Sequence, residues 1–545
     1  MSRRSASKTS ARSGRVAFVG AGPGDPGLLT VAATTLLGAA DAVIIDHVAR
    51  EALVERFCRP DVTVVDAGTA SLSHGDHGRP LTHAAKAKLV VKAAKATRRG
   101  LVVRLLDGDP SLFAGLAEEA LACHKAGVPF DIVPGVSAVG AVPAYAGIPL
   151  TTSKSTAVHV CHGPEAIEES IAADAAATVV LLGTPQILAA ALQRLLEVGR
   201  DPSAQVAITE NGTSVRQRTV VTSLGECGAH LPDTEFPALA VVGPTVELRQ
   251  ELSWFESKPL FGWDVLVPRT KEQSGSVSAH LATYGATATV VPTISVEPPR
   301  SPHQMDKAIR GLVTGRYEWI GFTSVNAVKA VREKIEECGL DARALAGLKI
   351  AAVGGVTADA LRAWGLGPDL IPSGEQSARG LLEDWPPYDD VLDPINRVLL
   401  PRADIATETL VAGLQGMGWE VDDVTAYRTV RAAPPAPEIR EAIKTGRFDA
   451  VLFTSSSTVR NLVGIAGKPH PTTVIACIGP ATAKTAEEHG LRVDVLAPEA
   501  SAVALVDALA DHGAALAATA SEAGEPVQRP SMRRPTARRR AKRNS

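Results

Sequence analysis

The amino-acid sequence predicts an α/β protein built from two modules, and four observations lead to that prediction. Short apolar runs alternate with helical patterns from Gly14 to about Glu256, which is typical of α/β domains. Gly/Pro-rich loops follow several of these runs, and the second half of the chain contains an internal duplication. A chain of 545 residues is also too long for a single hydrophobic core.

Composition favours a soluble, cytoplasmic protein without a metal site. The chain is 45% hydrophobic and 4% aromatic, and no run approaches the ~18 uncharged apolar residues of a membrane helix. The first 13 residues are basic and Ser-rich without an apolar core, so we do not expect a secretory signal. Six cysteines lie scattered without C-x-x-C spacing, which argues against disulfides or zinc and favours a reducing compartment.

The two ends are basic and the body between them is acidic. Four basic residues lie among the first 13 residues and eight among the last 17, with no acidic residue in either segment, although the formal net charge is −3. This distribution predicts no specific nucleic-acid partner and no membrane partner. We interpret residues 1–13 and 513–545 as disordered basic tails.

The stretch FVGAGPGDPGLLT, Phe18 to Thr30, predicts a ligand cradle. Val16 to Val19 form a short buried strand, and the three glycines that follow allow a tight turn and close approach to a ligand. Asp25 and Pro26 predict a helix start, with the carboxylate as N-cap and proline at the first position.

Two interpretations of this loop compete at first. A dinucleotide fold would explain why the second short strand, Asp41 to Asp46, ends in an acid, and a structural turn is the alternative. Pro23 removes a backbone donor, and Asp25 would repel a phosphate. Later loops at Asp107-Gly-Asp-Pro and Val133-Pro-Gly-Val-Ser-Ala favour a neutral or cationic ligand.

A series of motifs occurs in order over residues 14–256: GAGPGDPGLLT, RLxxGDP, VPGVSA, AYAGIPL, VVLLG, ENGT and PALAVVGPTVEL. In this order they resemble the tetrapyrrole methylases, and above all uroporphyrinogen-III C-methyltransferase. The resemblance implies two α/β subdomains with S-adenosylmethionine bound between them, and a homodimer formed through this module.

Residue by residue, the resemblance implies a cofactor site and a general base. The base would be Asp46, which would accept the proton lost when an electron-rich pyrrole carbon attacks the sulfonium methyl group. The implied cofactor-binding residues are Pro23, Asp107, Gly108, Asp109, Leu112, Ser137, Ala138, Leu182 and Gly212.

The sequence departs from the family in four places. Ala67-Gly68-Thr69 lies where the family has V-G-K-R, and Phe113-Ala-Gly-Leu lacks the arginine of F-G-R-G. Leu106 and Asp107 replace the lysine and first glycine of K-G-G-D-P, and Leu182 replaces a methionine. Because the substrate carries eight carboxylates, which arginine binds bidentately, an alternative is a methylase-like scaffold or regulator.

The duplication in the second half pairs three segments with three later ones. The pairs are Val265–Arg269 with Val398–Arg402, Phe322–Val328 with Phe453–Val459, and Ala352–Ala358 with Cys477–Ala483. Two copies of one α/β unit predict two similar lobes, with hydroxyl- and glycine-rich loops at the strand ends.

The motifs VLVPR, FTSVNAV, VGGVTADAL, LPRADIATETL, VTAYRTV, FTSSSTV and IGPATAKTAEEHGL resemble uroporphyrinogen-III synthase. The resemblance implies two Rossmann-like or flavodoxin-like lobes on a two-stranded tether. Lobe 1 would comprise 263–297 and 434–512, lobe 2 would comprise 298–433, and a linker at 257–262 would precede them. The reaction closes hydroxymethylbilane with inversion of its last pyrrole, which is mainly catalysis by positioning.

The same resemblance implies Tyr427 and Thr482 as catalytic residues. Tyr427 corresponds to Ile294 in the other copy, and its phenol would assist departure of hydroxide; a packed strand-end tyrosine is the alternative. Implied substrate contacts, several of which are equally suited to capping helices, are Thr323, Ser324, Asn326, Arg402, Thr454, Ser455 and Ser456.

Together the two modules predict a bifunctional enzyme of tetrapyrrole biosynthesis. The synthase would make uroporphyrinogen III, and the methylase would convert it to precorrin-2 for sirohaem or cobalamin. The alternatives are a synthase with a methylase-like scaffold or regulator, and a non-catalytic two-lobed binding protein.

Overall fold

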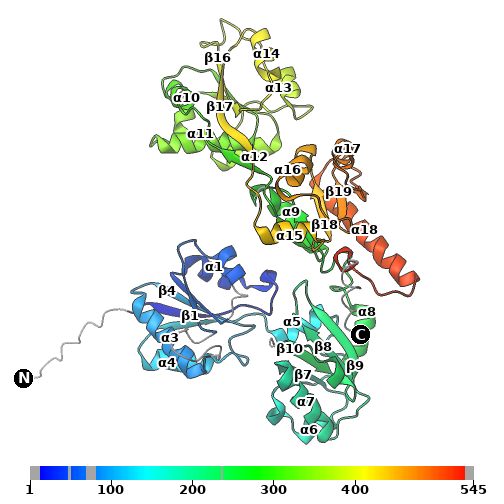
Figure 1. Cartoon of the computed structure of the whole chain (residues 1–545). Coiled ribbons are helices and arrows are strands. Elements are labelled where there is room, and N and C mark those ends of the chain that lie inside the picture. Colours follow the sequence, from blue (N-terminus) through cyan, green and yellow to red (C-terminus); the bar gives the residue numbers. More distant parts are fainter. Residues whose placement is uncertain (1–12, 47–50, 69–80, 235–236, 270, 534–545) are drawn as a thin grey trace, which may run out of the picture. The chain divides into compact units, whose positions relative to one another are not determined.

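The computed structural model describes residues 13–46, 51–68, 81–234, 237–269 and 271–533 (Figure 1). The chain divides into two compact units, Met1–Trp263 with Thr283–Thr287, and Asp264–Ala282 with Ala288–Ser545. Each unit contains two five-stranded sheets, so the predicted α/β architecture with two modules is confirmed.

The first sheet of unit 1 is entirely parallel in the pairings of β1, β2, β3, β4 and β5. In sheet order its strands are β3 (Thr63–Asp66), β2 (Ala42–Ile45), β4 (Leu101–Leu106), β1 (Arg15–Gly20) and β5 (Phe130–Val133). The helices between them are α1 (Val31–Ala39), α2 (Glu51–Phe57), α3 (His83–Ala96) and α4 (Leu116–Lys125). Strand β4 is buried along its whole length, as expected for a parallel strand covered on both faces.

The predicted helix start at Asp25 is only partly right. Asp25 accepts a hydrogen bond from Gly27 N and caps a 3-10 helix of three residues, Pro26–Leu28. The α-helix α1 begins later, where Thr30 accepts from Ala33 N. Leu28 and Leu29 therefore belong to the turn and not to the helical repeat.

The second sheet of unit 1 is mixed. Its order is β6 (Val158–His162), β7 (Thr178–Gly183), β10 (Ala238–Val242), β8 (Gln205–Glu210) and β9 (Arg218–Ser223). Strands β6 and β7 run parallel, and the other pairs are antiparallel. Its helices are α5 (Ala138–Tyr145), α6 (Glu169–Ala173), α7 (Pro185–Glu197) and α8 (Arg249–Leu252).

The predicted linker at 257–262 is not a free spacer, because it packs on unit 1. Leu260 N donates to Tyr284 O at 3.1 Å and Gly262 N to Gly285 O at 2.9 Å. Leu260 is fully buried. The aliphatic and aromatic side chains of this segment pack against the rest of unit 1, which removes their apolar surface from water.

Unit 2 contains two sheets of matching design. One has the order β12 (Thr287–Val290), β11 (Asp264–Val267), β18 (Ala450–Phe453), β19 (Val474–Cys477) and β20 (Val495–Leu496). The other has the order β13 (Ile294–Glu297), β17 (Glu420–Arg431), β16 (Arg397–Ala403), β14 (Trp319–Phe322) and β15 (Lys349–Ala352). The helices are α9 (Lys271–Thr283), α10 (His303–Val313), α11 (Val325–Glu337), α12 (Gly355–Ala363), α13 (Ala378–Asp384), α14 (Thr409–Gly416), α15 (Pro437–Lys444), α16 (Ser456–Ala466), α17 (Pro480–Glu488) and α18 (Ala502–Glu522).

The duplicated segments occupy equivalent strands, but each sheet draws on both copies. The VLVPR strand β11 lies beside β18 of the second copy, in the sheet that also contains β19, whereas β16 of the second copy lies beside β14 of the first, in the sheet that also contains β15. The lobe that includes β14 to β17 is therefore inserted between the two parts of the other lobe. Strand β13 pairs antiparallel with β17, where the sequence predicts a tether.

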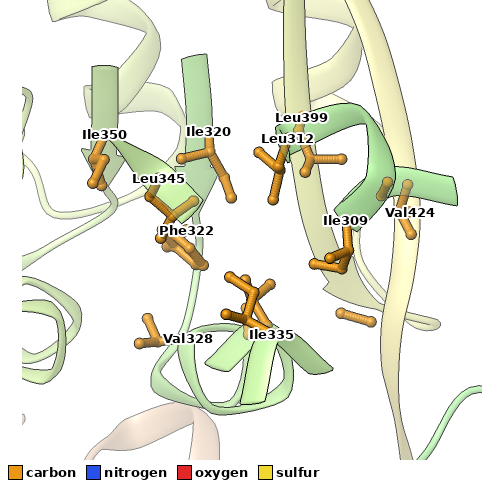
Figure 2. Packing of buried hydrophobic residues seen from close by; sticks show 14 of the residues in the cluster. Ile309, Leu312, Ile320, Phe322, Val328, Ile335, Leu345, Ile350, Leu399 and Val424 are labelled. Carbon is orange, nitrogen blue, oxygen red and sulfur yellow. The ribbon is translucent and has the colours of Figure 1, made fainter. Parts of the chain in front are cut away.

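The core of the inserted lobe shows how helices cover its sheet. Figure 2 shows Ile320 and Phe322 of β14 facing side chains of α10 and α11, among them Leu312 and Ile335. All four are less than 5% exposed. This packing fixes the N-terminus of α11 beside the carboxyl end of β14.

The predicted tail boundary at residue 513 is wrong. Helix α18 continues to Glu522 and is drawn in red in Figure 1, and a short turn at Pro530–Met532 follows. Ser531 N donates to Asp449 Oδ1 at 2.9 Å, so the described residues from 513 to 531 belong to the fold. Helix α18 is long and apolar enough to span a membrane by length and composition alone, with 28% of the tested window buried.

Candidate functional site

Three glycine loops of unit 1 meet at one edge of the parallel sheet. Strands β1, β4 and β5 are neighbours, so the loops after them emerge side by side at their carboxyl ends. A Cβ built on Gly135 would lie 2.2 Å from Gly108 O and 2.7 Å from Gly20 Cα. Only glycine allows this approach, and the carboxyl edge is where open α/β sheets bind ligands.

The first two loops are also hydrogen-bonded to each other. Gly22 N donates to Gly108 O at 3.2 Å, and Gly108 N donates to Gly22 O at 3.0 Å. Both glycines have positive φ, +69° and +62°, which side-chain-bearing residues rarely adopt. The predicted cofactor residue Gly108 therefore lies directly against the opening glycine loop.

The carboxylate of Asp109 holds the second and third loops together. Its Oδ2 accepts from Gly135 N at 2.9 Å, while Oδ1 accepts from Ser111 N at 2.8 Å and from the Ser111 hydroxyl. Burial would raise the pKa of Asp109, but these hydrogen bonds outweigh it and lower the pKa below its usual value. Asp107 and Leu112 are exposed on the same loop.

The opening loop reaches the second sheet of unit 1. Asp25 N donates to Thr213 Oγ1 at 3.0 Å, and Tyr145 OH donates to Asp25 Oδ2 at 2.8 Å. A Cβ on Gly24 would lie 2.8 Å from Gly212 O. The predicted residues Pro23 and Gly212 thus come from different sheets and lie close together.

The remaining predicted cofactor residues lie at the start of α5 and the end of β7. Ser137 caps α5, its hydroxyl accepting from Val139 N at 3.2 Å. Ala138 and Leu182 are partly buried and pack against one hydrophobic cluster that contains Val142 and Leu239. The loops at 23, 108–109, 137–138 and 212 therefore form one connected cradle.

Asp46 lies near the same edge within a network of charges. Since β2 and β4 pair Ile44 with Arg104, Asp46 lies level with the end of β4. Arg104 Nη2 is 2.9 Å from each oxygen of Asp46, and Lys86 Nζ is 3.0 Å from Oδ1. Arg104 also binds Glu119, through Nε at 2.7 Å and Nη2 at 2.9 Å.

The network keeps Asp46 ionised. Burial by itself would raise the pKa of Asp46, but the charges and hydrogen bonds of Arg104 and Lys86 hold the pKa below its ordinary value. The pKa of Arg104 is correspondingly raised, because Glu119 and Asp46 outweigh the effect of its burial. Asp46 can therefore accept a proton at neutral pH, although it is a weak base.

Sequence reasoning missed Lys86, Arg104 and Glu119. The resemblance to the methylases places a cation only at Ala67-Gly68-Thr69, where the family has V-G-K-R. Thr69 lies outside the described residues. The arginine could have been noticed as the one charged residue within the apolar run Leu101–Leu106, since fully buried arginines need a carboxylate partner.

A hollow of about 830 Å³ opens beside the loop that follows Asp109. It is lined by Phe113, Glu118 and the histidines His83, His124 and His162, among others. The rings of Phe113 and His162 stack with centroids 5.2 Å apart, and His162 Nδ1 lies 3.0 Å from Leu182 O. The hollow thus adjoins the predicted cofactor residue Leu182.

In unit 2, the structure brings together two predicted residues of the inserted lobe. Tyr427 OH lies 2.9 Å from Ser324 Oγ, and Ser324 caps α11 by accepting from Ala327 N at 3.1 Å. Thr323 and Asn326 flank this cap and are partly buried. Tyr427 is only 7% exposed, so its ring packs in the core while its hydroxyl reaches the helix N-terminus.

The geometry gives Arg402 a structural role rather than the predicted role in binding substrate. Its side chain is 4% exposed. Nε lies 2.7 Å from Asp423 Oδ1, Nη2 pairs with the same carboxylate, and Nη1 donates to Thr407 O. These contacts tie β16 to β17, because a buried guanidinium must be paired.

The predicted residues of the other lobe cluster at the starts of α16 and α17. Ser455 and Thr458 form a capping box on α16. Ser456 Oγ donates to Ala481 O at 3.0 Å, next to Thr482, which is 4% exposed. Thr454 is partly buried at the end of β18. Both lobes thus place hydroxyls at equivalent helix N-termini.

A relative that matches nearly the whole chain identifies the family. The porphyrin biosynthesis protein HemD of Ruminiclostridium josui is 31% identical over 513 residues, covering 92% of this chain and 98% of the relative. The chain belongs to this family of porphyrin biosynthesis proteins. The model for tetrapyrrole (corrin/porphyrin) methylases matches residues 15–228, and the model for uroporphyrinogen-III synthase HemD matches residues 275–507.

Two further relatives match less than half of this porphyrin biosynthesis protein. Siroheme synthase 2 of Cronobacter sakazakii is 38% identical over 252 residues, 45% of this chain and 53% of the relative, so the chain spans about half the length of that enzyme. The structure of uroporphyrin-III C-methyltransferase from Thermus thermophilus with S-adenyl homocysteine is 30% identical and has a TM-score of 0.35, covering 43% of this chain and 94% of that one.

These matches confirm the main predictions from the sequence. The chain is a bifunctional protein of tetrapyrrole biosynthesis, with a methylase module followed by a synthase module, and S-adenosylmethionine is the cofactor of the methylase module.

Proposed function

We propose that the chain closes hydroxymethylbilane to uroporphyrinogen III and methylates that product to precorrin-2, as a cytoplasmic enzyme. The observation that carries the methylase part is the meeting of the three glycine loops beside Asp46, at one edge of one sheet. A scaffold that no longer bound a cofactor would have no need for three backbones packed this closely.

The cradle fits S-adenosylmethionine in its chemistry. Gly20, Gly108 and Gly135 keep side chains out of the space, and Asp107 is exposed on the adjoining loop. We assign binding to the loops at 23, 107–109, 112, 137–138, 182 and 212. The cofactor supplies an electrophilic methyl group on a sulfonium, which exposed carboxylates favour electrostatically.

Asp46 would act as the proton acceptor. When a pyrrole carbon gains its methyl group, a carbon–proton bond must break, and the ionised carboxylate takes that proton. Arg104 and Lys86 fix the direction from which it does so. We place the tetrapyrrole in the adjoining hollow, whose histidines suit its carboxylates.

In the synthase module, Tyr427 would donate the phenolic proton to the departing hydroxide as the C–O bond breaks. Ser324 would hold the phenol in place. Thr482 and the hydroxyl-bearing loops at 323–326 and 454–456 would orient the bilane, since inversion depends on holding the last pyrrole in the correct position. Assembly as a homodimer through the methylase module is part of this proposal.

The test gives the purified protein hydroxymethylbilane and methyl-labelled S-adenosylmethionine together. We expect the inverted isomer to form and to carry label. Inverted product without label would instead support a synthase with a methylase-like scaffold. Predominance of the non-inverted isomer, which forms without catalysis, would support a binding protein.

A further inference from the structure

Glu119 and Arg104 form a complete ion pair inside unit 1. Both side chains are fully buried, and each oxygen of Glu119 accepts a hydrogen bond from Arg104, at 2.7 and 2.9 Å. One carboxylate and one guanidinium are already neutral together. The core therefore has no electrostatic need for a further pair of charges.

Asp46 and Lys86 nevertheless extend this pair outward. Arg104 contacts Asp46 from the buried side, while Lys86 contacts Oδ1 at 3.0 Å, and the side chains of Asp46 and Lys86 are each 16% exposed. Lys86 lies in the first turn of α3, whose start is fixed by Thr82 accepting from Ala85 N. The ammonium is therefore held by a helix whose first turn is itself anchored.

Stability alone is a poor explanation for Lys86. Partly buried charge networks contribute little net stability, because desolvation offsets the attraction, and ordering a lysine side chain costs conformational entropy. Proton transfer, in contrast, depends strongly on the orientation of the accepting carboxylate. A second cation on Oδ1 restrains rotation that one Arg104 nitrogen, 2.9 Å from both oxygens, leaves open.

We propose that Lys86 is a positioning residue for Asp46 in methyl transfer. It fixes the carboxylate together with the buried Arg104 and does not itself contact the tetrapyrrole. The inference rests on the proposed function, because it gives Lys86 a role only if Asp46 accepts a proton. The inference concerns α3 of this chain, because that helix carries Lys86.

The test compares Lys86→Met and Lys86→Arg in the full-length protein with Lys88→Met as a matched control. Lys88 is exposed two residues further along the same helix. Steady-state methyl transfer to uroporphyrinogen III gives kcat and KM separately. Binding of S-adenosylhomocysteine by calorimetry and the midpoint of thermal unfolding provide readouts that do not depend on activity.

We expect Lys86→Met to lower kcat about tenfold or more, with KM for uroporphyrinogen III and S-adenosylhomocysteine affinity within about twofold, since effects on alignment fall on the chemical step. Lys86→Arg should restore most of kcat. Three results would each overturn the positioning role. They are an unchanged kcat, a raised KM alone, and failure of Lys86→Arg to restore kcat together with a lowered unfolding midpoint. If wild type and Lys88→Met also transfer no label, it is the proposed methylation that fails.

Discussion

At Asp46, two effects act on one carboxylate in opposite directions. Burial disfavours the charge, while Arg104 and Lys86 favour it and win, so the pKa is lowered. A carboxylate this well stabilised is a weak base, so the proposed role in proton transfer would depend on where the carboxylate points. The partners of Asp46 come from other elements, Arg104 from β4 and Lys86 from α3. Together they hold the carboxylate in place.

Asp46→Asn should abolish most methyl transfer while leaving cofactor binding intact. The amide keeps the size of the side chain but cannot accept a proton, and general-base catalysis contributes about 10²- to 10⁴-fold. Labelled methyl incorporation measures the loss. Asp131→Asn, which removes an exposed ion pair with Arg15, is the control. Full activity in Asp46→Asn would exclude Asp46 as the base.

The lowered pKa also predicts how stability depends on pH. A carboxyl whose folded pKa lies below its unfolded value of about 3.9 stabilises the protein above that value, and the contribution disappears as pH falls through the folded pKa. The difference in unfolding midpoint between wild type and Asp46→Asn should therefore shrink below about pH 4. A difference that grows on acidification would contradict the lowered pKa.

Tyr427→Phe should slow formation of the inverted isomer strongly without unfolding the lobe. The ring packs in the core and stays, whereas the hydroxyl that contacts Ser324 at 2.9 Å is lost. Chromatographic separation of the two uroporphyrinogen isomers measures the effect. Tyr388→Phe is the control, since Tyr388 packs on Trp419 at another site. An unchanged isomer ratio and rate would leave Tyr427 as a packing residue.

At the scale of elements, the glycine loops act as one unit. Gly135→Ala would place a methyl group 2.2 Å from Gly108 O, so the second and third loops must move apart. We expect S-adenosylhomocysteine affinity to fall at least about tenfold, with destabilisation of about 1–3 kcal/mol. Gly140→Ala in α5, which meets nothing within 4 Å, is the control. Equal affinity in both variants would remove these loops from the cofactor site.

Elements defined by local sequence were predictable, whereas contacts between distant segments were not. Ser324 and Ser455 cap corresponding helices in both copies, because a serine before an apolar repeat is a local pattern. Arg104 finds Asp46 58 residues away and Glu119 15 residues away. Which carboxylates share a buried arginine depends on strand order and helix packing, which no short pattern encodes.

The same difference explains the segment before the synthase module. The sequence predicts a linker at 257–262, yet Phe261 of that linker packs on Phe255, and Phe255 packs on Tyr145, with ring centroids 5.2 and 4.7 Å apart. Tyr145 in turn donates to Asp25 in the opening loop, and burial and that carboxylate raise the pKa of Tyr145 to about 12. Aromatic residues in a short connection therefore indicated docking on unit 1.

At the scale of the whole chain, the C-terminal segment belongs to the synthase module. Asp449 is 1% exposed, and its two oxygens accept from Asp264 N and Ser531 N, both at 2.9 Å. One buried carboxylate thus joins the starts of β11 and β18 to the turn after α18. The segment is rich in Ala, Ser, Pro and Arg, so its composition does not predict this role. The contact with Asp449 is made by a single backbone N–H, that of Ser531.

Deleting residues 513–545 should therefore destabilise unit 2. The deletion removes the second half of α18, the buried Pro530 and the Ser531 N–H. A buried carboxylate that loses a donor costs about 1–3 kcal/mol, and the lost packing adds to it. Calorimetric unfolding of the truncated protein beside the full chain measures the change, which we expect to be several degrees. An unchanged midpoint would mean that residues 513–533 contribute nothing to the fold, as their composition alone suggests.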